Sequence, residues 1–142
     1  MNQYLKPDLS SQKEIEHKNI AAEFFDLIGA QKFKEGLRFF APNCKTHNPY
    51  ISGNMDTLTD AMIVANNEGT SKYPEAEFTV KNILADGDFV AVYTQLLSVK
   101  SKPEEGGLRQ VHLLRFDDNK IVEYWDITQQ ILPNMPNAKE AF

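Results

Sequence analysis

Hydrophobic and polar positions along this chain change period, from helical spacing in the first half to alternation in the second. The spacing of one helix face predicts an amphipathic helix over residues 11–28, carried by His17, Ala21, Phe24, Phe25 and Ile28. Ser10 or Ser11 is a suitable N-cap, with Glu14 placed for a capping box. Gly29 suits the C-terminal end of this helix.

Two further helices are predicted before the alternating region. Phe33, Leu37 and Phe40 share one helix face, and Pro42 is expected to end that helix. Residues 44–50 then form a short strand or an extended segment.

The third helix is predicted to start at a cap formed by Asp56 or Thr57 and to run to about Glu68. Its apolar side carries Leu58, Met62 and Ala65. A connecting loop over residues 69–74 follows.

From residue 76 onward the apolar residues alternate. A first strand contains Phe78 and Val80, and Asp86-Gly87 is a strong hairpin signal before a second strand over residues 89–99. A charged loop over residues 100–107 leads to the last hairpin.

That last hairpin consists of strands over residues 108–116 and 121–131. Asn119 tolerates positive φ, so we expect a three-residue loop with a bulge, in which Asp117 faces Ile121. Counting outward from this turn predicts the register. The expected pairs are Arg115 with Glu123, Leu113 with Trp125, Val111 with Ile127 and His112 with Asp126.

A slip of one residue would move every side chain to the other face of the sheet. The chosen register gives one face of apolar pairs with an ion pair. The second face, predicted to lie toward the helices, carries Gln110, His112, Leu114, Tyr124, Asp126 and Thr128. Polar groups between apolar neighbours indicate the wall of a pocket.

Helices followed by a meander predict an α+β fold, with the N-terminal helices packed on one face of an antiparallel sheet. The expected organisation is a single domain over residues 12–132, preceded by an arm (1–11) and followed by a C-terminal tail (133–142).

Composition narrows the classes of function. The chain has 142 residues, 42% of them hydrophobic, and a net charge of −5 without a basic cluster, so no nucleic-acid partner is expected. A single cysteine, Cys44, excludes an internal disulfide and is expected to be structural. No signal peptide or membrane-spanning stretch is expected, which predicts a cytoplasmic protein.

Two short runs resemble a known family. Residues 120–127 (KIVEYWDI), with Gln129 after them, resemble the ending of SnoaL-like polyketide cyclases of the NTF2-like superfamily. Residues 46–49 (THNP) are similar to a second element of that group, and the order of elements agrees over residues 12–131. Two positions depart from the pattern: Tyr124 stands where the family has His, and His112 where many members have Asp.

The resemblance implies a cone-shaped fold, in which the antiparallel sheet is curved and encloses a pocket for a small hydrophobic organic ligand. It also implies a cofactor-free cyclase or isomerase that performs aldol-type proton transfer, with the acid on the last strand, Asp126, as general acid/base and His112 beside it.

The residues themselves also favour Asp126 as the general acid or base. A carboxylate beside Trp125 and Tyr124 and across from His112 would have its pKa raised by desolvation or lowered by a histidinium, and a general acid or base needs such tuning. The alternative is a buried His–Asp pair that only fixes the hairpin.

The other candidates are expected to bind the substrate: His47, Gln110, Tyr50, Tyr93 and Tyr124. His47 either points into the cavity or satisfies backbone groups beside Asn48-Pro49. Both positions of the His47 side chain are open. His17 is predicted to be partly solvated. No metal-ligand spacing or phosphate loop is present in the sequence.

The functions that remain open are a cyclase or isomerase, a hydrolase of the same fold, a non-catalytic small-ligand binding protein, and an interaction protein whose sheet face only assembles dimers. Apolar side chains on the face away from the helices predict a homodimer.

Overall fold

The computed structural model describes residues 11–142, so the arm expected over residues 1–11 lies, up to residue 10, outside the described residues. The elements in chain order are α1 (Gln12–Gly29), η2 (Phe33–Phe39), β1 (Phe40–Thr46), α2 (Met55–Lys72), β2 (Glu77–Asp86), β3 (Phe89–Leu97), η3 (Pro103–Glu105), β4 (Gly107–Asp117), β5 (Lys120–Ile131) and η4 (Ala138–Glu140).

The first helix begins as its sequence predicts. The Ser11 hydroxyl accepts a hydrogen bond from the Glu14 backbone N–H at 3.1 Å, and the Glu14 carboxylate accepts one from the Ser11 N–H at 2.9 Å. These reciprocal bonds form the capping box and satisfy N–H groups that lack partners within the helix. The helix ends at Gly29.

The prediction of a second α-helix through Phe40 was wrong. Residues 33–39 form the short 3₁₀ helix η2, while Phe40 and Pro42 belong to strand β1. Phe40 lies edge-on to Phe24 of α1 and Tyr124 of β5, so packing against both elements draws it into the sheet. β1 is an edge strand with an irregular register, where a proline is tolerated.

The third predicted helix is longer than expected and has a different cap. It is α2, and the Asn54 side chain accepts the Thr57 N–H at 3.1 Å where Asp56 or Thr57 was expected to serve as the cap. Asn at an N-cap does this as well as Asp or Ser does.

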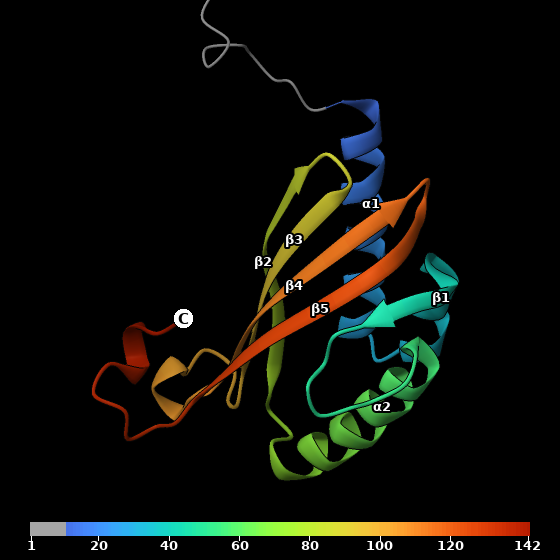
Figure 1. Ribbon diagram of the computed structural model, residues 1–142. Helices are drawn as coiled ribbons and strands as arrows, with labels where there is room; N and C mark the ends of the chain where they lie inside the picture. Colours follow the sequence, from blue (N-terminus) through green and yellow to red (C-terminus); the bar gives the residue numbers. More distant parts are fainter. Residues whose placement is uncertain (1–10) are drawn as a thin grey trace, which may run out of the picture.

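The five strands form one mixed sheet in the order β1-β5-β4-β3-β2. Strands β2 to β5 are an antiparallel meander, as predicted, but β1 runs parallel to β5, so the expectation of a wholly antiparallel sheet was wrong. Figure 1 shows a twisted sheet with α1 behind it and α2 across its lower end. The α+β class with helices on one face is confirmed.

The register of the last hairpin is confirmed, although its turn differs. Arg115 pairs with Glu123 and His112 with Asp126. Asp117 faces Lys120 rather than Ile121, and the residue with positive φ is Asp118, at 56°, rather than Asn119. A bulge next to Arg115 restores the predicted pairing from that point outward.

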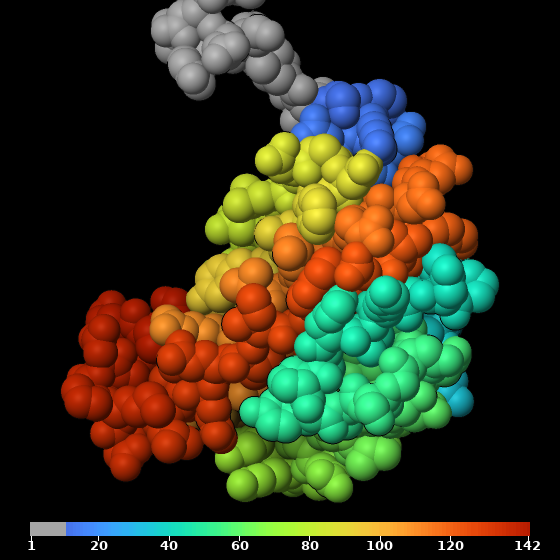
Figure 2. Space-filling view, in the orientation of Figure 1, coloured from blue at the N-terminus to red at the C-terminus, as the bar shows by residue number. Residues whose placement is uncertain are grey.

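The core lies between the helices and one face of the sheet, here called the inner face. It contains Phe24 and Phe25 of α1 with strand residues of even number in β3 and β4, such as Val90, Val92 and Leu114. Among residues 11–142, no helix covers the middle of β3–β5 on the opposite, outer face, and these strands form part of the surface in Figure 2. Within residues 11–142, none of the helices is long and apolar enough to cross a membrane.

The segment after β5 packs back on the sheet. Ala138 of η4 is buried, and an Arg109 N–H on β4 donates to the Ala141 carbonyl at 2.6 Å.

Candidate functional site

A cavity of about 800 Å³ lies between α1, α2 and the inner face of the sheet. This volume is within the range of small-molecule sites. Much of its wall is apolar and comes from the helices and β2, including Phe24, Ile28, Leu58, Met62 and Phe78. The polar groups come from the last two strands and the loop after β1: Asn48, Gln110, His112, Tyr124, Asp126 and Thr128.

Asp126 lies on this wall, and one of its carboxylate oxygens is held in place. Its Oδ2 accepts a hydrogen bond from the Asn48 side-chain amide at 2.7 Å. Its Oδ1 is buried and has no hydrogen-bond partner among residues 11–142. A buried acceptor without a donor is energetically costly, so a ligand N–H or O–H bound there would recover that free energy.

Asn48 lines the cavity and contacts Asp126, and it was not selected as a candidate from the sequence. Its side-chain oxygen accepts the backbone N–H groups of Tyr50 and Ile51, at 2.8 and 3.1 Å. These two donors fix which end of the amide is the oxygen, so the NH₂ group must point at Asp126. The Asn48-Pro49 pair was read only as a turn signal, and it is this turn that orients the amide.

His112 lies opposite Asp126 in the strand register but binds other partners. Its Nε2 is 2.9 Å from the Thr94 hydroxyl and its Nδ1 is 2.8 Å from the Tyr124 hydroxyl. Both ring nitrogens are therefore engaged, and the alternative of a hydrogen-bonded His112–Asp126 pair was wrong. Burial lowers the pKa of His112 to about 4, so the ring is neutral near pH 7.

The Tyr124 hydroxyl is the hydrogen-bond partner of His112 Nδ1 on this wall. Burial raises the pKa of this hydroxyl well above the usual range, and the negative charge of Asp126 adds to that effect. The hydroxyl is therefore protonated throughout the physiological range. It can donate to or accept from His112, depending on which nitrogen of the ring carries the proton.

Two more of the predicted residues line the cavity. The Gln110 amide donates to the Thr128 hydroxyl at 2.9 Å. Tyr50 also lines it, but 90% of its surface is exposed, so it stands at the cavity mouth.

His47 and Tyr93 lie outside the cavity, contrary to expectation. The His47 ring stacks on Trp125 on the outer face, with 4.5 Å between ring centroids, and its Nε2 is 2.8 Å from Glu123. Tyr93 pairs with Val111 on that face and accepts a hydrogen bond from Gln95. His47 and Asn48 follow the end of β1, and their consecutive side chains contact opposite faces of β5: His47 contacts Trp125, and Asn48 contacts Asp126.

The remaining titratable candidates have structural surroundings. His17 is fully buried, stacks on Phe116 and donates from Nε2 to the Asp118 carbonyl at 2.9 Å, so the expectation of a partly solvated side chain was wrong. Burial raises the pKa of the Cys44 thiol to about 11, so it is not an activated nucleophile. Residues 11–142 contain no cluster of three or more His, Cys, Asp or Glu side chains that could hold a metal ion.

The fold and this cavity define a class: α+β proteins in which helices close one face of a curved sheet around a pocket. The sequence model of the SnoaL-like domain matches residues 21–124, which is more than half of the chain. The protein belongs to the SnoaL-like family. Among curated proteins, none matches the chain.

Solved structures agree with this fold. AclR from Streptomyces galilaeus, a proposed hydroxylase, is 20% identical with a TM-score of 0.63, over 82% of this chain and 80% of that one. A proposed ketosteroid isomerase from Kribbella flavida is 18% identical with a TM-score of 0.62, over 92% and 90%. A SnoaL-like protein of unknown function from Burkholderia thailandensis is 16% identical with a TM-score of 0.63, over 84% and 99%. At these identities the likeness shows the fold.

Proposed function

We propose that the cavity binds a small, partly hydrophobic organic molecule and that the protein catalyses proton transfer on it without a cofactor. Asp126 is the general acid/base of this proposal. The observation that carries it is the state of its carboxylate, with Oδ2 held by Asn48 and Oδ1 buried without a partner on a largely apolar wall.

In the proposed reaction, the Asp126 carboxylate removes a proton from a carbon next to a carbonyl group of the substrate. The resulting enolate carbon attacks a second carbonyl of the same molecule, as in an aldol ring closure. The proton on Asp126 then passes to the new alkoxide, so the carboxylate is regenerated. An isomerisation would use the same residue, with the proton returned to a different carbon.

The negative charge that develops on the enolate oxygen needs hydrogen-bond donors. Gln110 supplies an amide N–H from the cavity wall. His112 acts through Tyr124: when Nδ1 carries the ring proton, it donates to the Tyr124 oxygen and leaves the tyrosine O–H free to donate to a substrate oxygen.

Non-catalytic binding is the second candidate, and one observation favours it. Both nitrogens of His112 are engaged by Thr94 and Tyr124, which leaves acid–base chemistry to a single carboxyl group. The named activities of the solved structures, hydroxylase and ketosteroid isomerase, favour an enzyme.

The test is exchange of α-hydrogens for deuterium in a panel of cyclic ketones and diketones, followed by NMR in D₂O. Asp126→Asn keeps the size of the side chain but removes the proton acceptor, so exchange should slow by about 10²–10⁴-fold. Asp117→Asn, on the exposed hairpin end, is the matched control and should exchange at the wild-type rate.

A thermal melt must show that Asp126→Asn is folded. A folded Asp126→Asn protein that exchanges as fast as the wild type would eliminate the assignment of Asp126. A wild-type protein that binds these ketones without accelerating their exchange would favour non-catalytic binding.

We also propose a homodimer formed through the outer face. Support comes from exposed apolar side chains on neighbouring strands of that face: Leu84 on β2, Phe89 on β3, Val111 on β4 and Ile127 on β5. Contiguous exposed apolar surface marks an interface, and two-fold dimers are the commonest assembly.

A further inference from the structure

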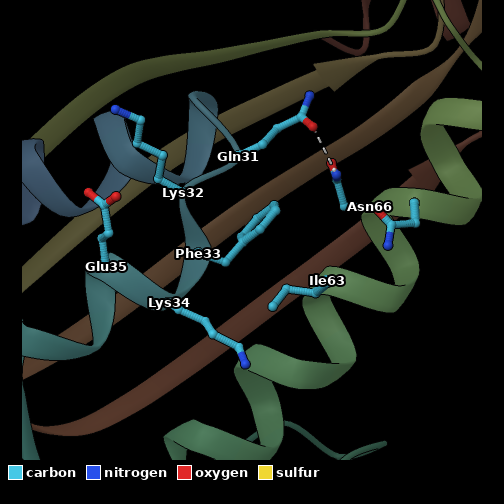
Figure 3. A pocket seen from close by; sticks show the side chains of 8 residues that line it. Gln31, Lys32, Phe33, Lys34, Glu35, Ile63 and Asn66 are labelled. Atoms are coloured by element: carbon cyan, nitrogen blue, oxygen red, sulfur yellow. Dashed lines mark hydrogen bonds between the residues drawn. The ribbon is translucent and has the colours of Figure 1, made fainter.

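A second hollow, of about 290 Å³, lies on the other side of the cavity wall. Residues 31–35, at the end of α1 and the start of η2, form one side of it, and Ile63 and Asn66 of α2 form part of the other. Figure 3 shows Phe33 and Lys34 extending toward α2, and Gln31 and Asn66 meeting across the gap, whereas Lys32 and Glu35 extend away from α2.

Three residues line both the hollow and the large cavity: Gln31, Phe33 and Asn66. They are therefore the partition between the two spaces. The Asn66 amide donates to the Gln31 side-chain oxygen at 3.2 Å, and this bond closes the partition on its exposed side. A single exposed hydrogen bond of this kind is weak, so the two side chains can part at small cost.

The backbone at Gln31 is unusual. Its φ is 61°, and the bonds from the Gln31 N–H to Ile28 and from the Lys32 N–H to Leu27 form a Schellman motif at the end of α1. Glycine is the favoured residue at such a left-handed position, because a Cβ is strained there. Here the position is occupied by glutamine, and its side chain is the one that reaches Asn66.

The charges around the hollow favour an anion. Lys32 and Lys34 line it together with one acid, Glu35, and within residues 11–142 neither lysine forms an ion pair. The chain as a whole is acidic, with a net charge of −5, so this local excess of positive charge stands out. Lysines and side-chain amides together suit carboxylate, sulfonate or phosphate oxygens.

We propose that the hollow is a second compartment of the ligand site. Parting of Gln31 and Asn66 joins it to the cavity. The exposed side chains of Lys32 and Lys34 then turn to bind the anionic group of a ligand whose apolar part occupies the cavity. This inference rests on the proposed small-molecule function and adds the substrate class: an elongated organic anion.

Two fluorescent probes separate the apolar and anionic parts of the site. 1-Anilinonaphthalene-8-sulfonate carries the charge, and N-phenyl-1-naphthylamine is the same ring system without the sulfonate. In the double variant Lys32→Gln/Lys34→Gln, the Kd of the sulfonate should rise by about three- to tenfold, the size of two exposed ionic contacts. The Kd of the uncharged amine should not change.

The matched control is Lys81→Gln/Lys139→Gln, which lowers the net charge equally at exposed positions away from both spaces. It should leave both Kd values at their wild-type level. Glu35→Gln should have the opposite effect to the lysine variant and tighten binding of the sulfonate.

The partition is tested by the rate of sulfonate binding in stopped flow. Gln31→Gly and Asn66→Ala each remove the closing hydrogen bond, so association should quicken by about two- to tenfold. Ser101→Gly is the matched control, because Ser101 has a φ of 62° but lies outside both linings. It should bind the probe at the wild-type rate.

The outcomes distinguish the two proposals. If neither probe binds the wild-type protein, the small-molecule function itself fails. If the uncharged amine binds but the Lys32/Lys34 variant leaves the sulfonate Kd unchanged, the anionic compartment alone is overturned. Equal association rates for Gln31→Gly and Ser101→Gly would overturn the partition.

Discussion

The two faces of the β4–β5 hairpin carry the same kinds of side chain in different states. On the inner face, His112 is buried between two hydroxyl groups and its pKa is lowered to about 4. On the outer face, His47 stacks on Trp125 and contacts Glu123 within reach of water.

The carboxylates differ in a parallel way. Glu123 on the outer face is bound by both His47 and Arg115, and these hydrogen bonds hold its pKa below the usual range. Asp126 on the inner face receives one neutral amide donor and keeps one oxygen without a partner. Charged groups that pair with each other stabilise a surface, whereas a carboxylate left incompletely satisfied beside a cavity is available to a ligand.

The largest difference between the faces should be in packing. Leu114 on the inner face is fully buried, so Leu114→Ala should lower the free energy of unfolding by about 2–5 kcal/mol. Ile127 on the outer face is 64% exposed, so Ile127→Ala should change the free energy of unfolding of the monomer by no more than about 0.5 kcal/mol. Urea denaturation of both variants at low protein concentration measures this. Equal losses would remove the distinction between the faces.

A somewhat smaller effect on the free energy of unfolding is expected from the neutral state of His112, and it depends on pH. An unfolded histidine titrates near 6.5, whereas folded His112 titrates at about 4. Between these values the unfolded chain takes up a proton that the folded protein does not, so stability falls as the pH is lowered from about 6.5 toward 4. From pH 7 to pH 5 this loss should be about 2 kcal/mol.

Denaturation of the wild type and of His112→Gln at several pH values tests this expectation. The variant should lack that part of the pH dependence, whereas His47→Gln on the outer face should retain it. The range from pH 7 to 5 is informative because carboxylates with lowered pKa values, such as Glu123, alter stability only at lower pH. Identical pH profiles for wild type and His112→Gln would show that the buried ring titrates as an ordinary histidine.

The smallest effect on folding, but a clear one on assembly, is expected at the outer face. Ile127→Asp places a charge in the proposed dimer contact and should leave the monomer folded, with a melting temperature near that of wild-type monomer. Sedimentation at micromolar concentration should then show a dimer for the wild type and a monomer for the variant. A wild-type monomer at these concentrations would contradict the dimer.

Much of this architecture is determined by local sequence. The capping box at Ser11 and Glu14 begins α1 through contacts between residues three apart, so no distant partner is needed. Alternation of apolar residues around one turn determines the register of β4 and β5, because a slip would expose the whole buried set. That register survived a wrong prediction of the turn, since a bulge compensated for the shorter loop.

The tertiary structure decided what the local patterns leave open. The pairing of β1 with β5 is a contact between segments far apart in the chain, and it took Phe40 out of the predicted helix. The same pairing places His47 against Trp125 on the outer face and Asn48 against Asp126 on the inner face, and no local periodicity encodes which strand a distant segment lies beside. The burial of His17 against Phe116 likewise depends on how α1 meets the hairpin. The sequence thus determined which side chains share a strand face, and only the packing of distant segments determined the hydrogen-bond partner of each.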